Sequence, residues 1–342
     1  MQPKTPNTDV FVAGGGPAGL AAAIAVRLKG FDVVVADAAQ PPIDKSCGEG
    51  LMPDSLAALH QLGVAIDREQ SFSFRGIRFI DAGGIAAADF PGEHGIAMRR
   101  LRLHQALIER ALELGVKLLW RTRVTGVDDL NARWIIGADG ANSSVRRWAA
   151  LQPVRSESHR FGFRRHYRVR PWTDFVEVYW GSGCQMYVTG VARDEMLIGL
   201  LTRDPHMRLN DALPLFPDLA RRLEGAATLS EERGAITVTR HLRRVYRGRI
   251  ALIGDASGSV DAITGEGMGL AFRQALELAD ALAADKLEQY QTAHRRLARR
   301  PAIMAQLMLT LDRFPRLRPL VLRAFGAKPF IFERLLAAHV GA

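Results

Sequence analysis

One stretch of thirty residues near the amino end, 9–38, constrains the fold more than any other part of this 342-residue sequence. An apolar strand pattern at 10–13 leads into a glycine-rich turn, a helix of small residues follows to Lys29, and a second apolar strand covers 33–35. A strand, a crossover helix and a parallel strand form the repeating unit of a doubly wound α/β sheet. The stretch therefore predicts the first unit of a Rossmann-like domain.

The turn has the glycine spacing of a dinucleotide site. The predicted phosphate cradle consists of Gly14, Gly16, Pro17, Ala18 and Gly19. Gly14 permits the tight turn, Gly16 lets a diphosphate approach the backbone, and Gly19 lets the helix lie close to the sheet. The N–H groups and dipole of the helix N-terminus attract phosphate. Asp37, 18 residues beyond Gly19, can accept hydrogen bonds from a ribose diol and disfavours a 2′-phosphate, so FAD or NAD is expected rather than NADP.

A signal peptide or membrane span is the alternative for this region, because residues 10–26 contain no charge. The run holds four glycines and a proline and is shorter than the ~20 residues that a span needs. No small-residue cleavage pattern follows it. We therefore expect a cytoplasmic globular protein.

The composition limits the kinds of partner that we expect the protein to bind. The net charge of +10 is spread through the sequence without a run of five like charges, and no nucleic-acid-binding module is recognisable, so we expect no nucleic-acid partner. Two cysteines, Cys47 and Cys184, fit a reducing compartment and exclude a CxxC redox centre. The nine histidines form no cluster with metal-ligand spacing, so we expect no metal.

Farther along the chain, hydrophobic periodicity predicts more elements. We expect a helix at about 54–61, two strands in 72–90 joined by Gly83-Gly84, a helix at 100–114, strands around 117–127 and 133–138, a strand at 249–254 and a helix at 266–284. Between 161 and 238, aromatic and β-branched residues alternate with charges, which indicates an antiparallel sheet with one wet face. Helices broken at prolines 301, 315, 319 and 329 are expected over 287–340.

These patterns predict an α/β fold with an inserted α+β part. The expected division is a discontinuous dinucleotide-binding domain at 1–71, 94–155 and 240–290, a substrate-binding sheet domain at 72–93 and 156–239, and a C-terminal helical segment at 291–342.

Two later segments repeat the strand–turn–helix theme. Residues 137–146 read GADGANSSVR after a predicted strand, and residues 250–269 pass from a strand through Gly254-Asp255 to the glycine-rich loop TGEGMG. With these segments in this order, the chain resembles the FAD-dependent oxidoreductase superfamily of p-hydroxybenzoate hydroxylase and geranylgeranyl reductase. The resemblance implies a glutathione-reductase-type FAD-binding domain with an inserted substrate domain and C-terminal helices.

The resemblance also implies roles for particular residues. Asp255 would bind the ribityl chain of FAD, and Asp139 would tie the flavin-binding loops together. The helix that opens at Gly265, Gly267 and Met268 would face the flavin ring, whose reduced form carries negative charge that helix N–H groups stabilise. Arg100 would reach FAD, with Arg99 as the alternative if the register shifts by one, and the backbone of Val124 would meet the adenine.

Two strings favour the geranylgeranyl reductase branch over the aromatic hydroxylases: KSCGEG at 45–50 and GDASGSVDAITGEG at 254–267. By this resemblance Cys47, Gly48 and Gly50 would contact the flavin ring. Cys47 and Glu49 are the candidate catalytic residues. An ordinary buried cysteine and a structural carboxylate are the alternatives. The WxWxIP signature of flavin-dependent halogenases is absent, so we do not expect halogenation.

The reaction implied by the resemblance is reduction of C=C bonds in a lipophilic, isoprenoid- or polyketide-like small molecule by hydride transfer from N5 of reduced flavin. A single-component flavin monooxygenase that uses NAD(P)H and O₂ is the alternative, and NAD(P)H is a candidate electron donor in both. A non-catalytic FAD- or partner-binding protein is a third hypothesis. The side chains expected to line the substrate pocket are Phe161, Tyr167, Tyr179, Met186 and Tyr187. For the basic, apolar segment 307–340, packing on the sheet is expected rather than peripheral membrane contact.

Overall fold

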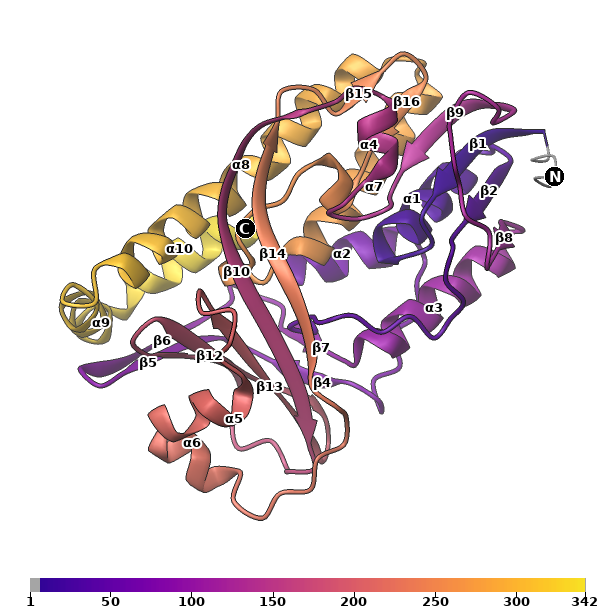
Figure 1. Cartoon of the computed structure of the whole chain (residues 1–342). Coiled ribbons are helices and arrows are strands. Elements are labelled where there is room, and N and C mark those ends of the chain that lie inside the picture. The colour runs from indigo at the N-terminus through magenta and orange to yellow at the C-terminus, as the bar shows by residue number, and fades with distance from the viewer. Residues whose placement is uncertain (1–6, 342) are drawn as a thin grey trace.

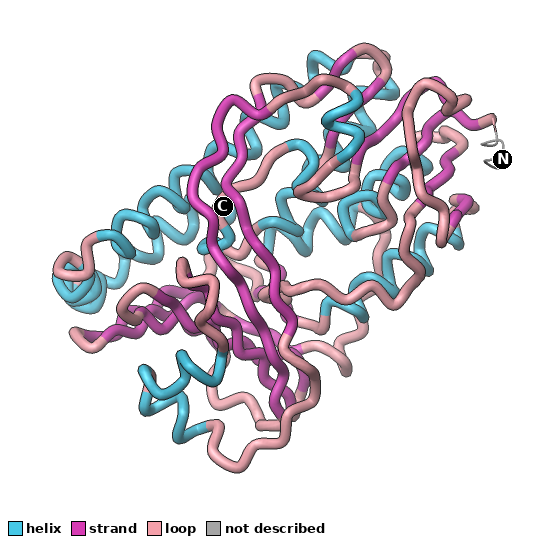
Figure 2. Tube along the Cα trace, in the orientation of Figure 1, coloured by secondary structure: helices cyan, strands magenta, loops and turns pink. Residues whose placement is uncertain are grey.

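The structure, a computed structural model, describes residues 7–341, and for residues 153–158 it describes the backbone alone. Two main sheets lie at an angle to each other, with helices packed around them (Figures 1 and 2). A third, small sheet joins them, formed by Gly50–Leu51 (β3), Gly95–Ala97 (β7) and Phe72–Phe74 (β4).

The first main sheet carries the glycine-rich unit predicted from the sequence. Its six strands lie in the order Tyr246–Arg247 (β15), Ile250–Leu252 (β16), Ala132–Gly137 (β9), Thr8–Ala13 (β1), Val33–Ala36 (β2) and Lys117–Leu119 (β8). All neighbours are parallel except β15 and β16. One face packs against Pro17–Leu28 (α1), Pro53–Gln61 (α2), Arg100–Glu113 (α3) and Gly267–Ala283 (α7), and the other against Ser144–Trp148 (α4).

Helix α1 lies close to the sheet because its sequence, PAGLAAAIAVRL, is built largely from small residues. A Cβ atom on Gly19 would come within 1.8 Å of the Gly14 carbonyl oxygen, so only glycine fits this crossing. The close approach places the N-terminus of α1 at the carboxyl ends of β1 and β9.

The second main sheet contains the inserted strands. Its seven strands lie in the order Arg233–Leu242 (β14), Pro153–Tyr167 (β10), Glu195–Thr202 (β13), Cys184–Ala192 (β12), Phe175–Trp180 (β11), Gly76–Asp81 (β5) and Gly84–Asp89 (β6). Only β11 and β5 pair in parallel. The first strand predicted in 72–90 divides at Arg75, so that β4 joins the small sheet and β5 the large one.

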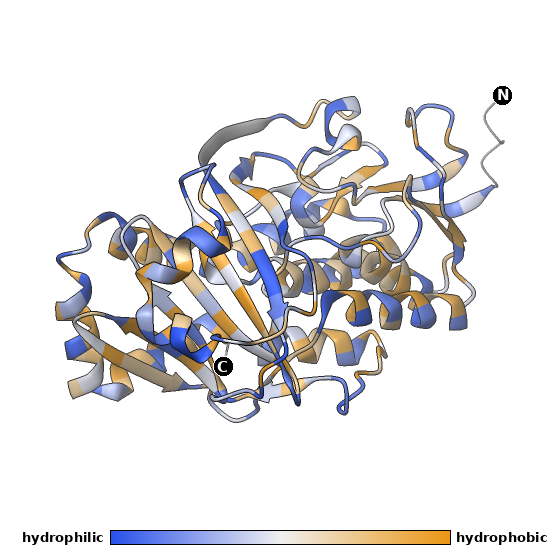
Figure 3. Ribbon diagram, turned by 60° about the horizontal axis from the view of Figure 1, so that its bottom comes forward, coloured by the Kyte–Doolittle hydropathy of each residue, from blue (hydrophilic) through white to orange (hydrophobic). Residues whose placement is uncertain are grey.

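The prediction of one wet face on this sheet was wrong, because every residue of β13 is buried. Met196 and Ile198 pack on one side with Leu209–Ala212 (α5) and Pro217–Arg222 (α6). Leu197 and Leu201 pack on the opposite side with the C-terminal helices. Figure 3 shows apolar residues along the strands of this sheet. Helices cover both faces, and several charged side chains on β10 are buried in ion pairs instead of facing water.

The strand predicted for 117–127 is much shorter than expected. Strand β8 ends at Leu119, and residues 120–131 form turns and loop. The Trp120 side chain leaves the strand pattern and lies against Gly15, and the Thr122 N–H donates to the Asp37 carbonyl oxygen at 2.8 Å. Contacts with the glycine-rich turn therefore replace strand pairing here.

The C-terminal segment forms three helices, Leu287–Arg313 (α8), Arg318–Ala327 (α9) and Pro329–Val340 (α10). The predicted break at Pro301 was wrong, since α8 continues through this buried proline. The breaks near Pro315, Pro319 and Pro329 were correct, with the last two in the first turns of α9 and α10. Within residues 7–341, no helix combines the length and apolar character that crossing a bilayer requires.

Arg160 of β10 connects the sheet, the loop before α7 and helix α8, and its side chain has no exposed surface. Its Nη1 donates to Gln185 Oε1 at 2.9 Å, and Nη2 donates to Asp312 Oδ2 at 2.5 Å. The Nε atom lies 3.5 Å from Asp261 Oδ2. Two carboxylates therefore balance one buried guanidinium between three parts of the chain.

We predict that Arg160→Met lowers the free energy of unfolding by about 3–5 kcal/mol, because it leaves buried carboxylates without their cation. Arg203→Met is the matched control: Arg203 Nη2 also lies 3.0 Å from Asp312 Oδ2, but its side chain is half exposed. This control is expected to cost less than about 1 kcal/mol. Urea unfolding of both variants measures the difference, and equal losses would contradict the role of Arg160.

Candidate functional site

The glycine-rich turn after β1 has one crowded glycine and one open glycine. Gly14 has φ +114°, and a Cβ atom there would lie 2.4 Å from the Ala138 carbonyl oxygen. A Cβ atom on Gly16 would meet no atom within 4 Å. Gly14 is therefore required by the backbone, whereas Gly16 leaves free space at the N-terminus of α1, where an anion can bind.

Asp37 lies at the end of β2 beside this turn. Its Oδ2 accepts from the Gly15 N–H at 2.7 Å, and its Oδ1 accepts from the Ala39 N–H at 2.8 Å. Each carboxylate oxygen has a second acceptor position, so the group can still bind a ligand hydroxyl. The sequence correctly predicted that Asp37 and the glycine turn come together.

Two residues beside this turn were missed by sequence reasoning. His104 of α3 lies 2.7 Å through Nε2 from the Gly15 carbonyl oxygen. Burial lowers the pKa of His104, so the imidazole is neutral at pH 7 and Nε2–H donates. The Trp120 ring lies where a Cβ atom on Gly15 would be. Neither residue belongs to a glycine-rich string, and only the fold brings them to the turn.

The GADG segment after β9 supports the turn from the other side. Asp139 accepts from the N–H groups of Ser144 and Val145, at 2.6 and 3.1 Å, and from the Ser143 hydroxyl. Its carboxylate therefore caps helix α4. Arg146 of α4 donates to the Ala256 carbonyl oxygen at 3.0 Å, which joins this segment to the loop after β16.

The Gly254-Asp255 turn after β16 lies against the start of α1. Gly254 has φ +59°, and its Cβ position lies 2.8 Å from Ala18 Cβ. Asp255 is exposed to solvent, yet burial by the surrounding protein raises the pKa of its carboxyl, against the opposing charges of Lys45, Arg240 and Arg146. Three glycine-rich segments, far apart in sequence, meet beside Asp255. We call the region that they border, which includes the open Cβ position of Gly16, the recess.

Cys47 connects the loop at 44–50 to the start of α7. Its Sγ lies 3.8 Å from Met268 Sδ and accepts from the Glu49 N–H at 3.3 Å. Burial, with a contribution from the charge of Glu49, raises the pKa of the thiol to about 11. The thiol therefore keeps its proton at neutral pH, and Cys47 is no thiolate nucleophile.

Glu49 is buried and adopts a left-handed backbone conformation, φ +61°, which is rare for a residue with a side chain. Its Oε1 accepts from the Arg100 N–H at 3.0 Å, and its Oε2 lies 2.8 Å from His166 Nε2. Arg100 Nη1 donates to the Ile43 carbonyl oxygen at 2.5 Å. These contacts anchor the loop to α3 and β10, so the structural role that the sequence left open for Glu49 is observed.

The alternative Arg99 points elsewhere. Its Nε donates to Glu195 on β13. Val124 lies in the loop after β8 rather than in the predicted strand, and it packs beside the residues on the α4 face of the first sheet.

The TGEGMG loop presents glycines to open space and a glutamate to the interior. A Cβ atom on Gly48, Gly265 or Gly267 would meet nothing within 4 Å. The Glu266 side chain is buried, with Oε2 3.3 Å from His339 Nε2 on α10 and Oε1 3.6 Å from Arg273 Nη2. Burial raises the pKa of Glu266 to about 8 and lowers that of His339 to about 4. Both groups are therefore mainly neutral at pH 7.

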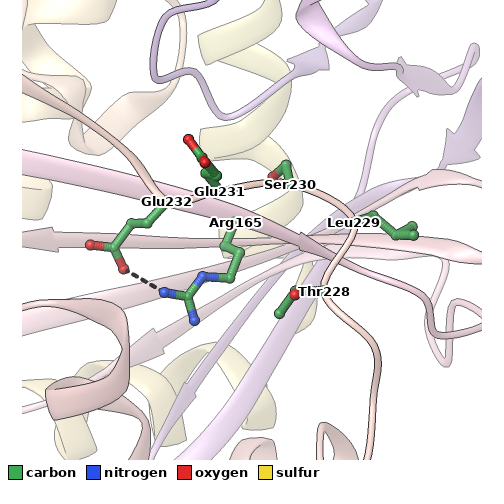
Figure 4. Close-up of a pocket in the computed structure, with 6 residues that line it drawn as sticks. All are labelled: Arg165, Thr228, Leu229, Ser230, Glu231 and Glu232. Atoms are coloured by element: carbon green, nitrogen blue, oxygen red, sulfur yellow. Dashed lines mark hydrogen bonds and ion pairs between the residues drawn. The ribbon is translucent and has the colours of Figure 1, made fainter.

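Two surface hollows are lined by residues outside the glycine-rich segments. Figure 4 shows the hollow lined by Arg165, Thr228, Leu229, Ser230, Glu231 and Glu232, with a volume of about 580 Å³. The other, of about 570 Å³, is lined by Arg170, Arg193 and Asp194. Neither hollow includes a residue of the glycine-rich segments, and we place the candidate site at the recess between those segments.

Most of the predicted substrate-lining residues lie on the wrong face of the sheet. Tyr167, Tyr179 and Met186 are buried in the core beneath α5 and α6. Phe161 has the same strand parity as Tyr167 and the opposite parity to Arg160. Only Tyr187 faces the candidate site, where its hydroxyl donates to the Ile263 carbonyl oxygen at 2.9 Å.

The difference between the crowded Gly14 and the open Gly16 can be tested by substitution. Gly16→Val should leave the apo protein folded, because its Cβ meets free space, but it should abolish FAD binding. Gly14→Val should destabilise the protein itself, because a side chain would meet the Ala138 backbone. Thermal unfolding and the flavin absorbance of purified protein measure both effects. FAD retention in Gly16→Val would contradict this position for the phosphate cradle.

Glu266 predicts a pH dependence of stability. An unfolded glutamate releases its proton near pH 4.5, whereas folded Glu266 holds it up to about pH 8. Between these values the folded state binds more protons, so the free energy of unfolding falls as pH rises, by up to about 1.4 kcal/mol per pH unit. The measurement uses about pH 6.5–8, because His339 in the unfolded protein takes up its proton mainly below its usual pKa of 6.5.

Urea unfolding across this window should show the falling stability in the unmodified protein and a flatter profile in Glu266→Gln, which carries no ionisable group there. Identical slopes would show that Glu266 does not hold its proton in the folded state.

Comparison with known proteins agrees with this assignment of the candidate site. A family model described as FAD binding domain matches residues 7–129. Menaquinone reductase of Mycobacterium tuberculosis (strain ATCC 25618 / H37Rv) is 29% identical, over 93% of this chain and 88% of that protein. Digeranylgeranylglycerophospholipid reductase 2 of Methanopyrus kandleri is 27% identical, over 83% of this chain and 79% of that protein.

Solved structures share the fold. A geranylgeranyl bacteriochlorophyll reductase-like protein from Thermoplasma acidophilum has a TM-score of 0.71 at 19% identity, with 91% of each chain covered. The p-nitrophenol 4-monooxygenase of Pseudomonas putida has a TM-score of 0.81 at 17% identity, covering 98% of this chain and 97% of that one. Residues 7–129 thus match an FAD binding domain, and most of the chain is similar to proteins named menaquinone reductase and digeranylgeranylglycerophospholipid reductase.

Proposed function

We propose that this protein reduces C=C bonds in a lipophilic, isoprenoid-like small molecule with FAD as its cofactor. The observation that carries this proposal is similarity over most of the chain to proteins named menaquinone reductase and digeranylgeranylglycerophospholipid reductase. The KSCGEG and TGEG strings, which the fold brings together through Cys47 and Met268, support the same choice.

The recess between the glycine-rich segments fits FAD. We propose that the cofactor is held by Gly14, Gly16, Pro17, Ala18 and Gly19 at the diphosphate, Asp37 at the ribose, Val124 at the adenine, Asp255 at the ribityl chain, and Cys47, Gly48, Gly50, Gly265, Gly267 and Met268 around the flavin ring. The open Cβ positions of Gly16 and Gly267 supply the space. Asp139 and Arg100 act on the same loops through their backbone contacts.

Charge also fits. A diphosphate brings negative charge to the recess, and three cations, Lys45, Arg146 and Arg240, act on Asp255 there. Asp255 and Asp139 are the carboxylates that act on Arg146 there, so two carboxylates oppose three cations and the balance favours an anion. The buried carboxyl of Glu266 is mainly neutral at pH 7, so it offsets little of the positive end of α7.

Bound FAD in its reduced form would supply hydride to one alkene carbon, and a protonated group must supply the other hydrogen. Cys47 is our candidate acid, because its thiol is protonated at neutral pH and sits beside the start of α7. Glu49 is a positioning residue, since its carboxylate is occupied by Arg100 and His166.

We propose that residues 1–71, 94–155 and 240–290 hold the cofactor, that 72–93 and 156–239 hold the substrate, and that 291–342 cover the site. The buried apolar cluster that includes Phe74, Phe90 and Ile263 packs between these parts. The unpaired cysteines agree with a cytoplasmic location, and NAD(P)H is the proposed electron donor.

A flavin monooxygenase is the second candidate, because p-nitrophenol 4-monooxygenase shares the fold. Anaerobic incubation of dithionite-reduced holoprotein with a geranylgeranyl compound, which has no quinone to reduce, distinguishes the two. The proposal expects a product heavier by two hydrogens, identified by mass spectrometry. A product formed only in air, with oxygen from ¹⁸O₂, would establish the monooxygenase and overturn the reductase.

Variants of Cys47 test the proposed acid. Cys47→Ala should retain FAD but lose most of the reduction rate, and Cys47→Ser should keep more, because a hydroxyl can still donate a proton. Flavin content and single-turnover rates are the measurements. Equal rates in the alanine variant and the unmodified protein would exclude Cys47 as the proton source.

A further inference from the structure

The turns around α9 expose large apolar side chains. Phe314, Leu317, Leu320 and Phe330 are each 44–58% exposed, and all lie within or next to this helix. The β5–β6 hairpin borders this surface, since α9 packs on β6 and the Gly83 turn meets Pro319. We call Phe314, Leu317, Leu320 and Phe330 the apolar rim. Figure 1 shows α9 and the β5–β6 hairpin together at one end of the molecule, far from the N-terminus.

Cations surround the apolar rim. Arg313, Arg316, Arg323 and Lys328 are exposed, and no carboxylate among the described residues pairs with them. Glu333 is the only acidic residue between positions 313 and 334, and Asp81 lies at the neighbouring hairpin turn. The surface therefore combines apolar side chains with a local excess of positive charge, which is the pattern of segments that lie at a membrane interface.

We infer that the apolar rim and its four cations dock this protein on an anionic lipid bilayer. A second copy of the chain fits less well, because a symmetric contact through the apolar rim would bring the same cations face to face. A bilayer supplies a hydrocarbon layer for the phenylalanines and leucines and anionic headgroups for the arginines and lysine. From the sequence we expected this segment to pack on the sheet rather than to contact a membrane. Helices α8, α9 and α10 do pack on the sheet. In our inference they also expose the surface that docks on the bilayer.

Helix α10, which follows the docking surface, also packs against the segments of the candidate site. Leu336 and Phe332 of α10 belong to the same buried cluster as Ile263, and His339 at the end of α10 contacts Glu266 at the start of α7. A lipophilic substrate dissolved in a bilayer would thus be close to the helices that cover the site. This connection rests on the proposed function, whereas the docking itself does not.

Flotation with vesicles tests the docking, with FAD-loaded protein and no substrate. Vesicles of phosphatidylethanolamine with phosphatidylglycerol should bind the protein, and vesicles of phosphatidylcholine alone should bind it far more weakly. Reversing three cations, Arg316→Glu, Arg323→Glu and Lys328→Glu, should lower the partition coefficient by about a hundredfold or more. Replacing the apolar side chains, Phe314→Ser, Leu317→Ser and Leu320→Ser, should lower it by about tenfold or more.

A matched control uses equally exposed apolar residues elsewhere, Leu112→Ser, Leu215→Ser and Ile236→Ser, which are 54–60% exposed and should bind as the unmodified protein does. Circular dichroism and flavin content verify folding of each variant. Absence of binding to anionic vesicles, or equal loss in the control, would overturn the inference. A dimer in solution that only the rim variants dissociate would assign the surface to a second copy. Vesicle binding by protein that reduces no C=C bond in the separate anaerobic assay would refute the proposed function alone.

Discussion

The buried guanidinium of Arg160 is the interaction on which the arrangement of the molecule depends. It lies on β10 and pairs with Asp261 in the loop before α7 and with Asp312 on α8. An unpaired charge at this depth would be very costly, so the three segments must stay together. Through this contact, the sheet, the proposed flavin loop and the C-terminal helices form one structure around the candidate site.

A second buried network connects the other side of the recess to the sheet. Glu49 accepts from the first turn of α3 and contacts His166 on β10, and His166 Nδ1 lies 2.8 Å from the Ser230 hydroxyl. The left-handed backbone of Glu49 is held by these contacts and by the Cys47 thiol. The loop beside the proposed flavin ring is thus fixed by polar contacts to two elements, which favours a preorganised site.

Local sequence patterns predicted the structure correctly where the same residues serve both the fold and the proposed function. Gly14 and Gly19 are required by backbone contacts within about 3 Å, so their spacing predicted the first βαβ unit and the helix position together. The Gly254-Asp255 turn and the GADG segment were correctly placed after strands for the same reason. The predicted wet face failed, because the charged residues of β10 pair inside the protein, and the break at Pro301 failed, because packing holds α8 together across it.

The sequence by itself determined the FAD-binding type of fold and its reductase-like loops, because these depend on short strings whose glycines and acids act through nearby backbone. Only the tertiary structure decided which side chains face the recess. His104 and Trp120 reach the glycine-rich turn from separate segments, while Tyr167 and Met186 lie on the far side of the sheet. Which face of a strand becomes buried against which helix depends on distant packing, and no local pattern carries that information.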